Sequence, residues 1–294
     1  MTGPLTVHTG GTETLLPKDF RWPGGKRIAV FFRMAFEIWS DDKWPGVSPM
    51  GNPLKPGFPD LNARGWAEYA VRRGVFRGLD AFAYHDIKGT IITNGLLAER
   101  YPHIVKQIAD AGHEICAHSY TMDLMSIYLN EEEERANIRR DVELITKATG
   151  KRPVGWSNPR GTPSPATARL LAEEGFEWHG DTLNDDLPYL VSYGKHSIVA
   201  IPGTMDVNDL PLYMKHGQPP EVFVKNFEEW LKYVQKREKG AVKIDPTIHA
   251  HCFGRPNGTW AFERVMELAK KAGDDVWIGT RAEAAAHVRK VLKA

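Results

Sequence analysis

Seven polar residues in this 294-residue chain stand where predicted strands end, and their types suit proton transfer or metal binding. They are Glu37, Asn94, His118, Arg160, Asp181, His249 and His251. Imidazole and carboxylate groups are the usual general acids and bases of enzymes, and both also bind metal ions. Chemistry collects at the carboxyl ends of the strands in an α/β barrel, so we expect these side chains to share one site.

The pair His249 and His251 has alternate-residue spacing, which on a strand directs both imidazoles to one face. Such a pair supplies two of the three or four ligands that zinc requires, and Glu37 or His118 would supply the others. The sequence equally allows one functional histidine, with the other hydrogen-bonded to the following loop, 252–256. Both interpretations stay open at this point.

Composition excludes several classes of protein. Two cysteines, Cys116 and Cys252, rule out a disulfide framework and a four-thiolate metal site, and they suit a reducing compartment. The formal net charge of +1 gives no reason to expect nucleic acid or an anionic membrane as a partner. The N-terminus lacks a signal-peptide pattern, and no run of about 18 apolar residues occurs. These features predict a cytoplasmic protein that takes a small-molecule substrate.

Apolar runs alternate with helical periodicity along the chain, without an internal repeat or an interdomain linker. The predicted strands cover 27–33, 90–93, 114–117, about 154–156, 189–201, about 246–251 and 276–278. The predicted helices cover 66–85, 95–111, 131–149 with Asn130 and Gly150 as caps, 165–174, 220–238, 260–272 and 280–292. Residues 1–25 are predicted to be irregular, and 40–64 to be a long loop.

This alternation predicts a largely parallel sheet or barrel covered by helices. A single distorted (β/α) barrel over residues 26–294 fits best, and a doubly wound sheet is the alternative. The alternative is weaker because no Gly-x-Gly-x-x-Gly motif follows a strand.

Residues 111–120, together with 86–94, resemble the second motif of the polysaccharide deacetylase family, whose NodB-like domain is a distorted α/β barrel. The similarity extends from about Arg27 to about Leu292. Three segments resemble the branch that contains allantoinases and cyclic imide hydrolases, namely 69–77, 182–189 and 249–256. The resemblance also implies a homotetramer.

This chain departs from the typical site of that family, which has an aspartate base, an aspartate metal ligand and two histidine ligands four residues apart. Ala35 stands at the base position and Glu37 at the metal position, while His118 is followed by Met122 where the second histidine belongs. A thioether is a poor ligand for zinc. The allantoinase-like members share the glutamate and lack the second histidine, so the resemblance implies hydrolysis without a metal.

The resemblance to this branch implies a hydrolase of non-peptide carbon–nitrogen bonds that opens a small cyclic amide, imide or ureide. Glu37 and His118 are expected to share proton transfer, with the pKa of one of them shifted by burial. Arg160 is expected to hold a carbonyl oxygen or orient Glu37, and His249 to protonate the leaving nitrogen. The expected substrate contacts are Trp39, Asn94, Tyr120, Asp181, Asp185 and His251, with Trp44 as a further aromatic wall.

Two other functions stay open. A metal-dependent deacetylase of an N-acetylated sugar or polysaccharide would bind zinc at Glu37, His118 and His249 or His251. A catalytically inactive barrel that serves as a binding module is the second, because Ala35 and Met122 replace typical site residues.

Overall fold

The structure, a computed structural model, describes residues 5–45, 54–55 and 57–294. Most of the predicted loop 40–64 lies either in irregular backbone or, at 46–53 and 56, outside the described residues. Helix α1 (Leu61–Tyr69) begins inside that stretch, because the side chain of Asp60 accepts a hydrogen bond from the backbone N–H of Ala63 and caps the helix.

The strands form a nine-stranded sheet in the order β1-β8-β9-β7-β6-β5-β4-β3-β11 and a three-stranded sheet in the order β10-β2-β12. Their bounds are β1 (Thr12–Thr14), β2 (Ile28–Val30), β3 (Arg33–Phe36), β4 (Thr90–Thr93), β5 (Glu114–Ala117), β6 (Gly155–Trp156), β7 (Trp178–His179), β8 (Tyr189–Tyr193), β9 (His196–Ala200), β10 (Val242–Ile244), β11 (Thr247–His249) and β12 (Val276–Ile278). All pairs are parallel except β1 with β8 and β8 with β9.

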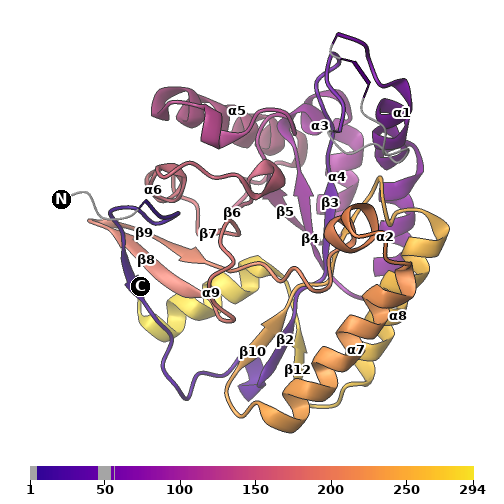
Figure 1. The fold of residues 1–294 in the computed structure, drawn as a ribbon. Helices are drawn as coiled ribbons and strands as arrows, with labels where there is room; N and C mark the ends of the chain where they lie inside the picture. The colour runs from indigo at the N-terminus through magenta and orange to yellow at the C-terminus, as the bar shows by residue number, and fades with distance from the viewer. Residues whose placement is uncertain (1–4, 46–53, 56) are drawn as a thin grey trace.

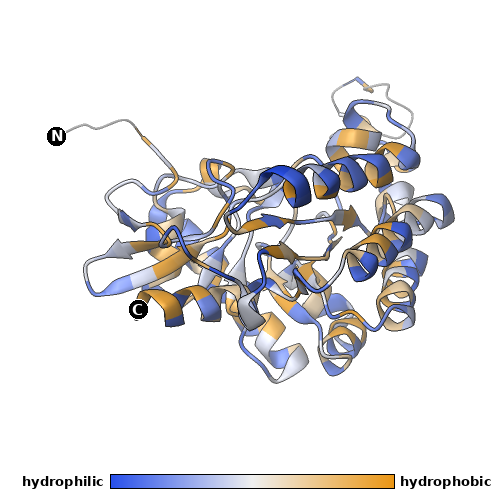
Figure 2. Cartoon of the chain, turned by 90° about the horizontal axis from the view of Figure 1, so that it is seen from below, coloured by the Kyte–Doolittle hydropathy of each residue, from blue (hydrophilic) through white to orange (hydrophobic). Residues whose placement is uncertain are grey.

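Helices surround the strands (Figure 1), and α7 and α8 pack against each other beside the smaller sheet. The remaining helices are α2 (Val75–Tyr84), α3 (Gly95–Arg100), α4 (Pro102–Asp110), α5 (Glu131–Thr149), α6 (Thr167–Glu173), α7 (Pro220–Arg237), α8 (Pro256–Lys271) and α9 (Arg281–Leu292). Figure 2 shows mostly apolar strands at the centre and helices with alternating apolar and hydrophilic stripes, the pattern of helices that pack on one side. In the described part of the chain, no helix is long and apolar enough to cross a membrane.

The predicted α/β class is confirmed, and strands β4, β5 and β12 have the predicted bounds. The long helix at 131–149 is also confirmed, with a capping box at Asn130 and a left-handed Gly150 at its end. Two predictions were incomplete. The segment 1–25 contains β1, a short exposed strand that pairs with β8, and the strand at 242–244 (β10) was missed.

The predicted first strand, 27–33, is two strands with different neighbours. Strand β2 pairs with β10 and β12, whereas β3 pairs with β4 and β11. The chain therefore passes from the small sheet to the large one at Phe31 and Phe32. This change of partners leaves two sheets, so the described strands do not close into a ring, and the barrel is distorted in this sense.

The inner face of the sheet carries the polar residues because side chains alternate along each strand. On β3, Met34 and Phe36 lie in the large core beneath the helices, whereas Ala35 belongs to a second cluster with Ile92 and Cys116. Arg33 shares the face of Ala35. Continuing this alternation past the strand ends places the next inner residues, Glu37 and His118, at the carboxyl edge of the sheet.

An ion network lies on the inner face below that edge. Arg281 donates from Nε and Nη2 to Oδ1 of Asp245, at 3.0 and 2.8 Å, and Lys243 Nζ contacts Oδ2 at 2.8 Å. All three side chains are buried. Burial alone would raise the pKa of Asp245, but Arg281, Lys243 and Arg33 outweigh it and hold that pKa well below its usual value.

We expect Asp245→Asn to lower the free energy of unfolding at pH 7 by about 3–5 kcal/mol, because it leaves buried cations without a carboxylate. Since the pKa of Asp245 is lowered, its contribution is complete above the pKa of the unfolded chain and is lost as the pH falls toward the folded value. Urea unfolding of Asp245→Asn and of the exposed control Asp19→Asn measures the difference. Equal values for the two variants would contradict the prediction.

Candidate active site

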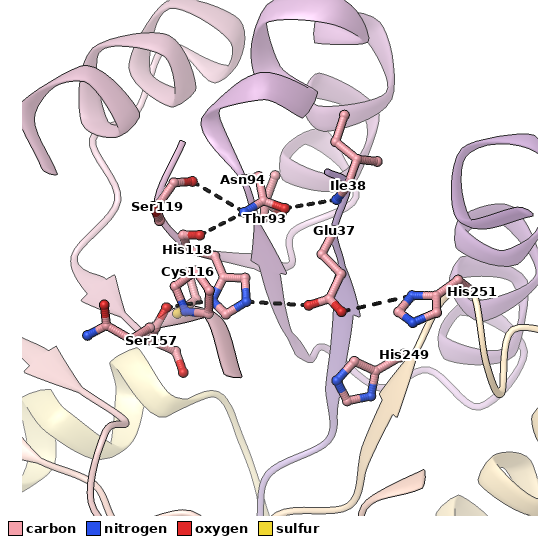
Figure 3. Close-up of polar contacts among 12 residues, drawn as sticks. Glu37, Ile38, Thr93, Asn94, Cys116, His118, Ser119, Ser157, His249 and His251 are labelled. Atoms are coloured by element: carbon pink, nitrogen blue, oxygen red, sulfur yellow. Dashed lines mark hydrogen bonds and ion pairs between the residues drawn. The ribbon is translucent and has the colours of Figure 1, made fainter. Parts of the chain in front are cut away.

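Glu37 is the centre of a group of four residues, Glu37, His118, His249 and His251, called here the Glu–His cluster (Figure 3). It follows β3 directly, and only 1 % of it is exposed. Its Oε2 lies 3.4 Å from Nε2 of His118, and its Oε1 lies 3.9 Å from Nδ1 of His251. Oε1 is buried and has no hydrogen-bond partner within the described residues.

The imidazoles around Glu37 lower the pKa of its carboxyl group. Burial would raise the pKa of Glu37, but His249, His118 and His251 together lower it to about 2. Glu37 is therefore ionised at neutral pH. An ionised, buried oxygen without a donor is costly, so Oε1 is a strong acceptor for a ligand that brings an N–H or O–H group.

His118 follows β5 and is fixed from both sides. Its backbone N–H donates to Oδ2 of Asp141 at 2.9 Å, and its Nδ1 lies 2.5 Å from the carbonyl oxygen of Ser157. A carbonyl oxygen only accepts, so Nδ1 carries the hydrogen. Nε2 is thus the nitrogen that faces Glu37 and can take or give a proton there.

His249, at the end of β11, is paired with Asp209. Nδ1 of His249 lies 2.6 Å from Oδ1 of Asp209, and the backbone N–H of His249 donates to Oδ2 at 2.7 Å. Burial would lower the pKa of His249, but Asp209 and Glu37 outweigh it and raise that pKa. His249 is thereby suited to hold a proton near neutral pH, with Nε2 as the free donor.

His251 lies beyond the strand, in the turn after β11, so the expectation that both histidines lie on one strand is wrong. The side chain still reaches Glu37, because the turn brings it against Trp66, with ring centroids 4.5 Å apart in a T-shaped arrangement. Burial lowers the pKa of His251 to about 4 despite the carboxylate of Glu37. His251 is therefore neutral at pH 7.

Asn94, expected to contact substrate, instead holds the backbone of the cluster in place. Its Oδ1 accepts from the N–H of Ile38 at 2.9 Å, and its Nδ2 donates to the carbonyl of His118 at 2.7 Å (Figure 3). A second, longer contact runs from Nδ2 to the carbonyl of Ser119. The amide is fully used, so Asn94 is a positioning residue that links the ends of β3 and β5.

Asp181 acts on the cluster indirectly, through hydrogen bonds to Asn158. Both of its oxygens accept from Asn158, at 2.6 Å from the backbone N–H and 2.8 Å from Nδ2. Burial raises the pKa of Asp181 to about 6 despite these hydrogen bonds. The pair fixes the strand end that presents the Ser157 carbonyl to His118.

Three predicted residues lie elsewhere. Arg160 is exposed on a turn with φ 56°, Tyr120 donates to Glu99 at 2.7 Å, and exposed Asp185 accepts from the N–H of Leu187. Within the described residues, no hydrogen bond or ion pair joins any of the three to the Glu–His cluster. The expected role of Arg160 in orienting Glu37 therefore has no contact to support it.

Trp39 does lie at the cluster. Its ring is 5.6 Å from that of His251, and Trp39 and Trp44 both line a pocket of about 120 Å³. Trp39 thus links this pocket to the cluster, and the expectation that Trp39 and Trp44 line the substrate site stays a prediction.

Three residues of the site were missed in the sequence. Asp209 stands 40 residues before His249, Trp66 lies on α1, and Asp141 lies on α5. Asp141 and Trp66 read as ordinary helix residues, and Asp209 belongs to no spacing motif. Only the folded chain brings them beside the histidines.

The cluster does not fit a metal ion. Within the described parts of the chain, no group of three or more histidine, cysteine, aspartate or glutamate side chains is arranged to hold one. Ala35 and Met122 offer neither a carboxylate nor an imidazole, and Met122 is packed in the core. The expectation that the reaction needs no metal stays a prediction.

A buried carboxylate among histidines lies at the carboxyl edge of a mostly parallel sheet, where enzymes of the α/β class carry out acid–base catalysis. Comparison with known proteins agrees. Residues 67–179 match the sequence model for polysaccharide deacetylases. A probable polysaccharide deacetylase from Pseudomonas aeruginosa PAO1 is 30% identical, with a TM-score of 0.83 over 92% of this chain and 93% of that one. The chain belongs to the polysaccharide deacetylase family, which is hydrolytic.

Two further relatives differ in their stated activity. The crystal structure of Puue allantoinase has a TM-score of 0.85 and 29% identity, over 99% of this chain and 98% of that one. The peptidoglycan deacetylase of Helicobacter pylori is 27% identical over 75% of this chain and 85% of its own length. The family therefore leaves the substrate class open.

Proposed function

We propose that this protein hydrolyses a carbon–nitrogen bond of a small cyclic amide, imide or ureide, by attack of water on a ring carbonyl and without a metal. The observation that carries the proposal is Oε1 of Glu37, a buried carboxylate oxygen that has no hydrogen-bond donor among the described residues and lies among three imidazoles. Such an oxygen can accept a hydrogen bond from a water or from a ring N–H.

Water activation falls to Glu37 and His118. Glu37 orients the water through Oε1, and the proton that leaves the water is taken up by the pair, with Nε2 of His118 as its acceptor 3.4 Å from Oε2. The carbon–oxygen bond forms at the carbonyl, and the ring carbon–nitrogen bond then breaks. His249, which holds a proton because of Asp209, supplies it to the leaving nitrogen.

We expect Asp209→Asn to move the alkaline limb of the kcat/KM profile to lower pH. His249 must be protonated to act, and the negative charge of Asp209 is what raises its pKa against burial. Without that charge the pKa falls, so the rate declines at a lower pH. Rates measured from pH 5 to pH 10 with Asp209→Asn and with Asp19→Asn as control test this. An unmoved limb would mean that His249 is not the acid.

The similarity to Puue allantoinase over almost the whole of both chains supports this proposal. The names of other relatives favour a second candidate, deacetylation of a polysaccharide. In the alternative drawn from the sequence, this reaction removes an N-acetyl group and uses a metal. The two candidates differ in substrate and in the need for metal, so one experiment separates them.

That experiment is a substrate panel assayed with and without chelator, containing hydantoins, succinimide-like imides, allantoin and N-acetylglucosamine oligomers. Chelator-resistant ring opening supports the proposal. Activity confined to the acetylated sugars, lost on chelation and restored by zinc, establishes the deacetylase instead. A completely inert panel contradicts both and favours a binding module.

A further inference from the structure

Arg33 is a buried cation that the chemistry above leaves without a role. It lies on β3, is 7 % exposed, and its Nε has no hydrogen-bond partner. Within the described residues, no hydrogen bond or ion pair of the guanidinium group occurs. Arginine is rarely buried unless it is paired, because an uncompensated buried charge is costly.

Within the described residues, no neighbouring carboxylate pairs directly with Arg33. Lys243 and Arg281 share the carboxylate of Asp245, and the carboxylates of Asp245 and Asp181 act on Arg33 only at a distance, without an ion pair to it in the described part of the chain. Burial and the charge of Arg281 lower the pKa of Arg33 to about 10, which leaves it charged at pH 7.

Arg33 lies directly below the Glu–His cluster. Side chains two residues apart share a face, so Arg33, Ala35 and Glu37 follow one another up the inner face of β3. Ala35 pairs in register with His249 on β11 on one side and with Ile92 on β4 on the other. Because Ala35 has only a methyl group, little side-chain volume separates the guanidinium of Arg33 from Glu37.

We propose that Arg33 is a ligand-binding residue that receives a carboxylate at the floor of the site, beneath Glu37 and His249. A guanidinium group binds a carboxylate through two parallel hydrogen bonds, and the unpartnered Nε is one of the donors suited to this.

The carboxylate is the one that hydrolysis creates, and in this step alone the inference rests on the proposed function. Attack of water forms a carbon–oxygen bond as the carbon–nitrogen bond breaks, and the nitrogen leaves with a proton. The resulting carboxylic acid loses its own proton and becomes an anion with two equivalent oxygens. Arg33 holds that anion away from Glu37, whose negative charge would otherwise repel it.

Acetate is the probe, because it presents a carboxylate and needs no turnover. We expect acetate, exchanged for chloride at constant ionic strength, to raise the unfolding temperature of the wild-type protein. In Arg33→Met the affinity for acetate should fall about tenfold or more. The affinity of Arg33→Lys should lie between those of the wild type and Arg33→Met, because lysine keeps the charge but lacks the planar guanidinium group. Arg73→Met, at an exposed arginine, is the matched control and should behave as wild type.

Stability without acetate separates ligand binding from a structural role. If the role of Arg33 is to bind a ligand, the unfolding temperature of Arg33→Met should be equal to or higher than that of the wild type. The reason is that the substitution removes a buried charge that has no direct partner. A large loss of stability, failure to fold, or acetate binding equal in wild type and Arg33→Met would each overturn the proposal. Because acetate binding is measured without substrate, a protein inert to cyclic amides can still confirm or refute the role of Arg33.

Discussion

Glu37→Gln is expected to lower kcat/KM for an accepted cyclic amide by about 10³-fold, within the range found for loss of a general base. The substitution keeps the shape of the side chain but removes its negative charge. In the proposed mechanism the charged carboxylate orients water and forms a proton-accepting pair with His118. The fold should remain, because the ion pairs of the carboxylate within the described residues are with histidines of the cluster. Steady-state kinetics together with thermal unfolding measure the two effects separately.

Glu132→Gln is the control for this experiment, since Glu132 is exposed in the first turn of α5. It should leave both rate and unfolding temperature unchanged. The charge of Glu37 contributes to stability above the pKa of the unfolded chain, and that contribution is lost as the pH falls to about 2. A Glu37→Gln enzyme with a near-normal rate would remove Glu37 from the reaction.

His118→Ala is expected to lower kcat/KM by about 10²–10⁴-fold, because the proposed mechanism makes Nε2 of His118, 3.4 Å from Glu37, the proton acceptor. The hydrogen bond from Nδ1 to the carbonyl of Ser157 is lost as well. The measurement is kcat/KM across pH on a protein shown to be folded by its circular dichroism spectrum.

A double variant tests whether the two groups work together. Residues that act as one unit show grossly non-additive losses, so Glu37→Gln with His118→Ala should be about as slow as the slower single variant. Losses that multiply would instead mean that Glu37 and His118 act in separate steps.

Local patterns were sufficient for much of the fold. The capping residues Asn130 and Gly150 mark the bounds of α5, and short apolar runs mark β4 and β5, because caps and periodicity depend on neighbours in sequence. The division of 27–33 into β2 and β3 was not predictable in this way. It depends on pairing with β10 and β12 on one side and with β4 and β11 on the other.

The same distinction between local pattern and tertiary contact applies to the candidate site. Sequence alone indicated Glu37, His118, His249 and His251 as its candidate acids and bases, from residue type, position at strand ends and family resemblance. It also showed that Ala35 and Met122 remove two of the typical metal-site residues.

Only the tertiary structure decided the charge and contacts of those residues. Asp209, 40 residues away in the chain, raises the pKa of His249, and the three imidazoles lower the pKa of Glu37, which burial alone would raise. The polar groups of Asn94 and Asp181 are hydrogen-bonded within the fold, and the expected contact of these residues with substrate stays a prediction. Residue type and local spacing are properties of the sequence, whereas electrostatic balance and hydrogen-bond partners depend on distances that exist only after the sheet has formed.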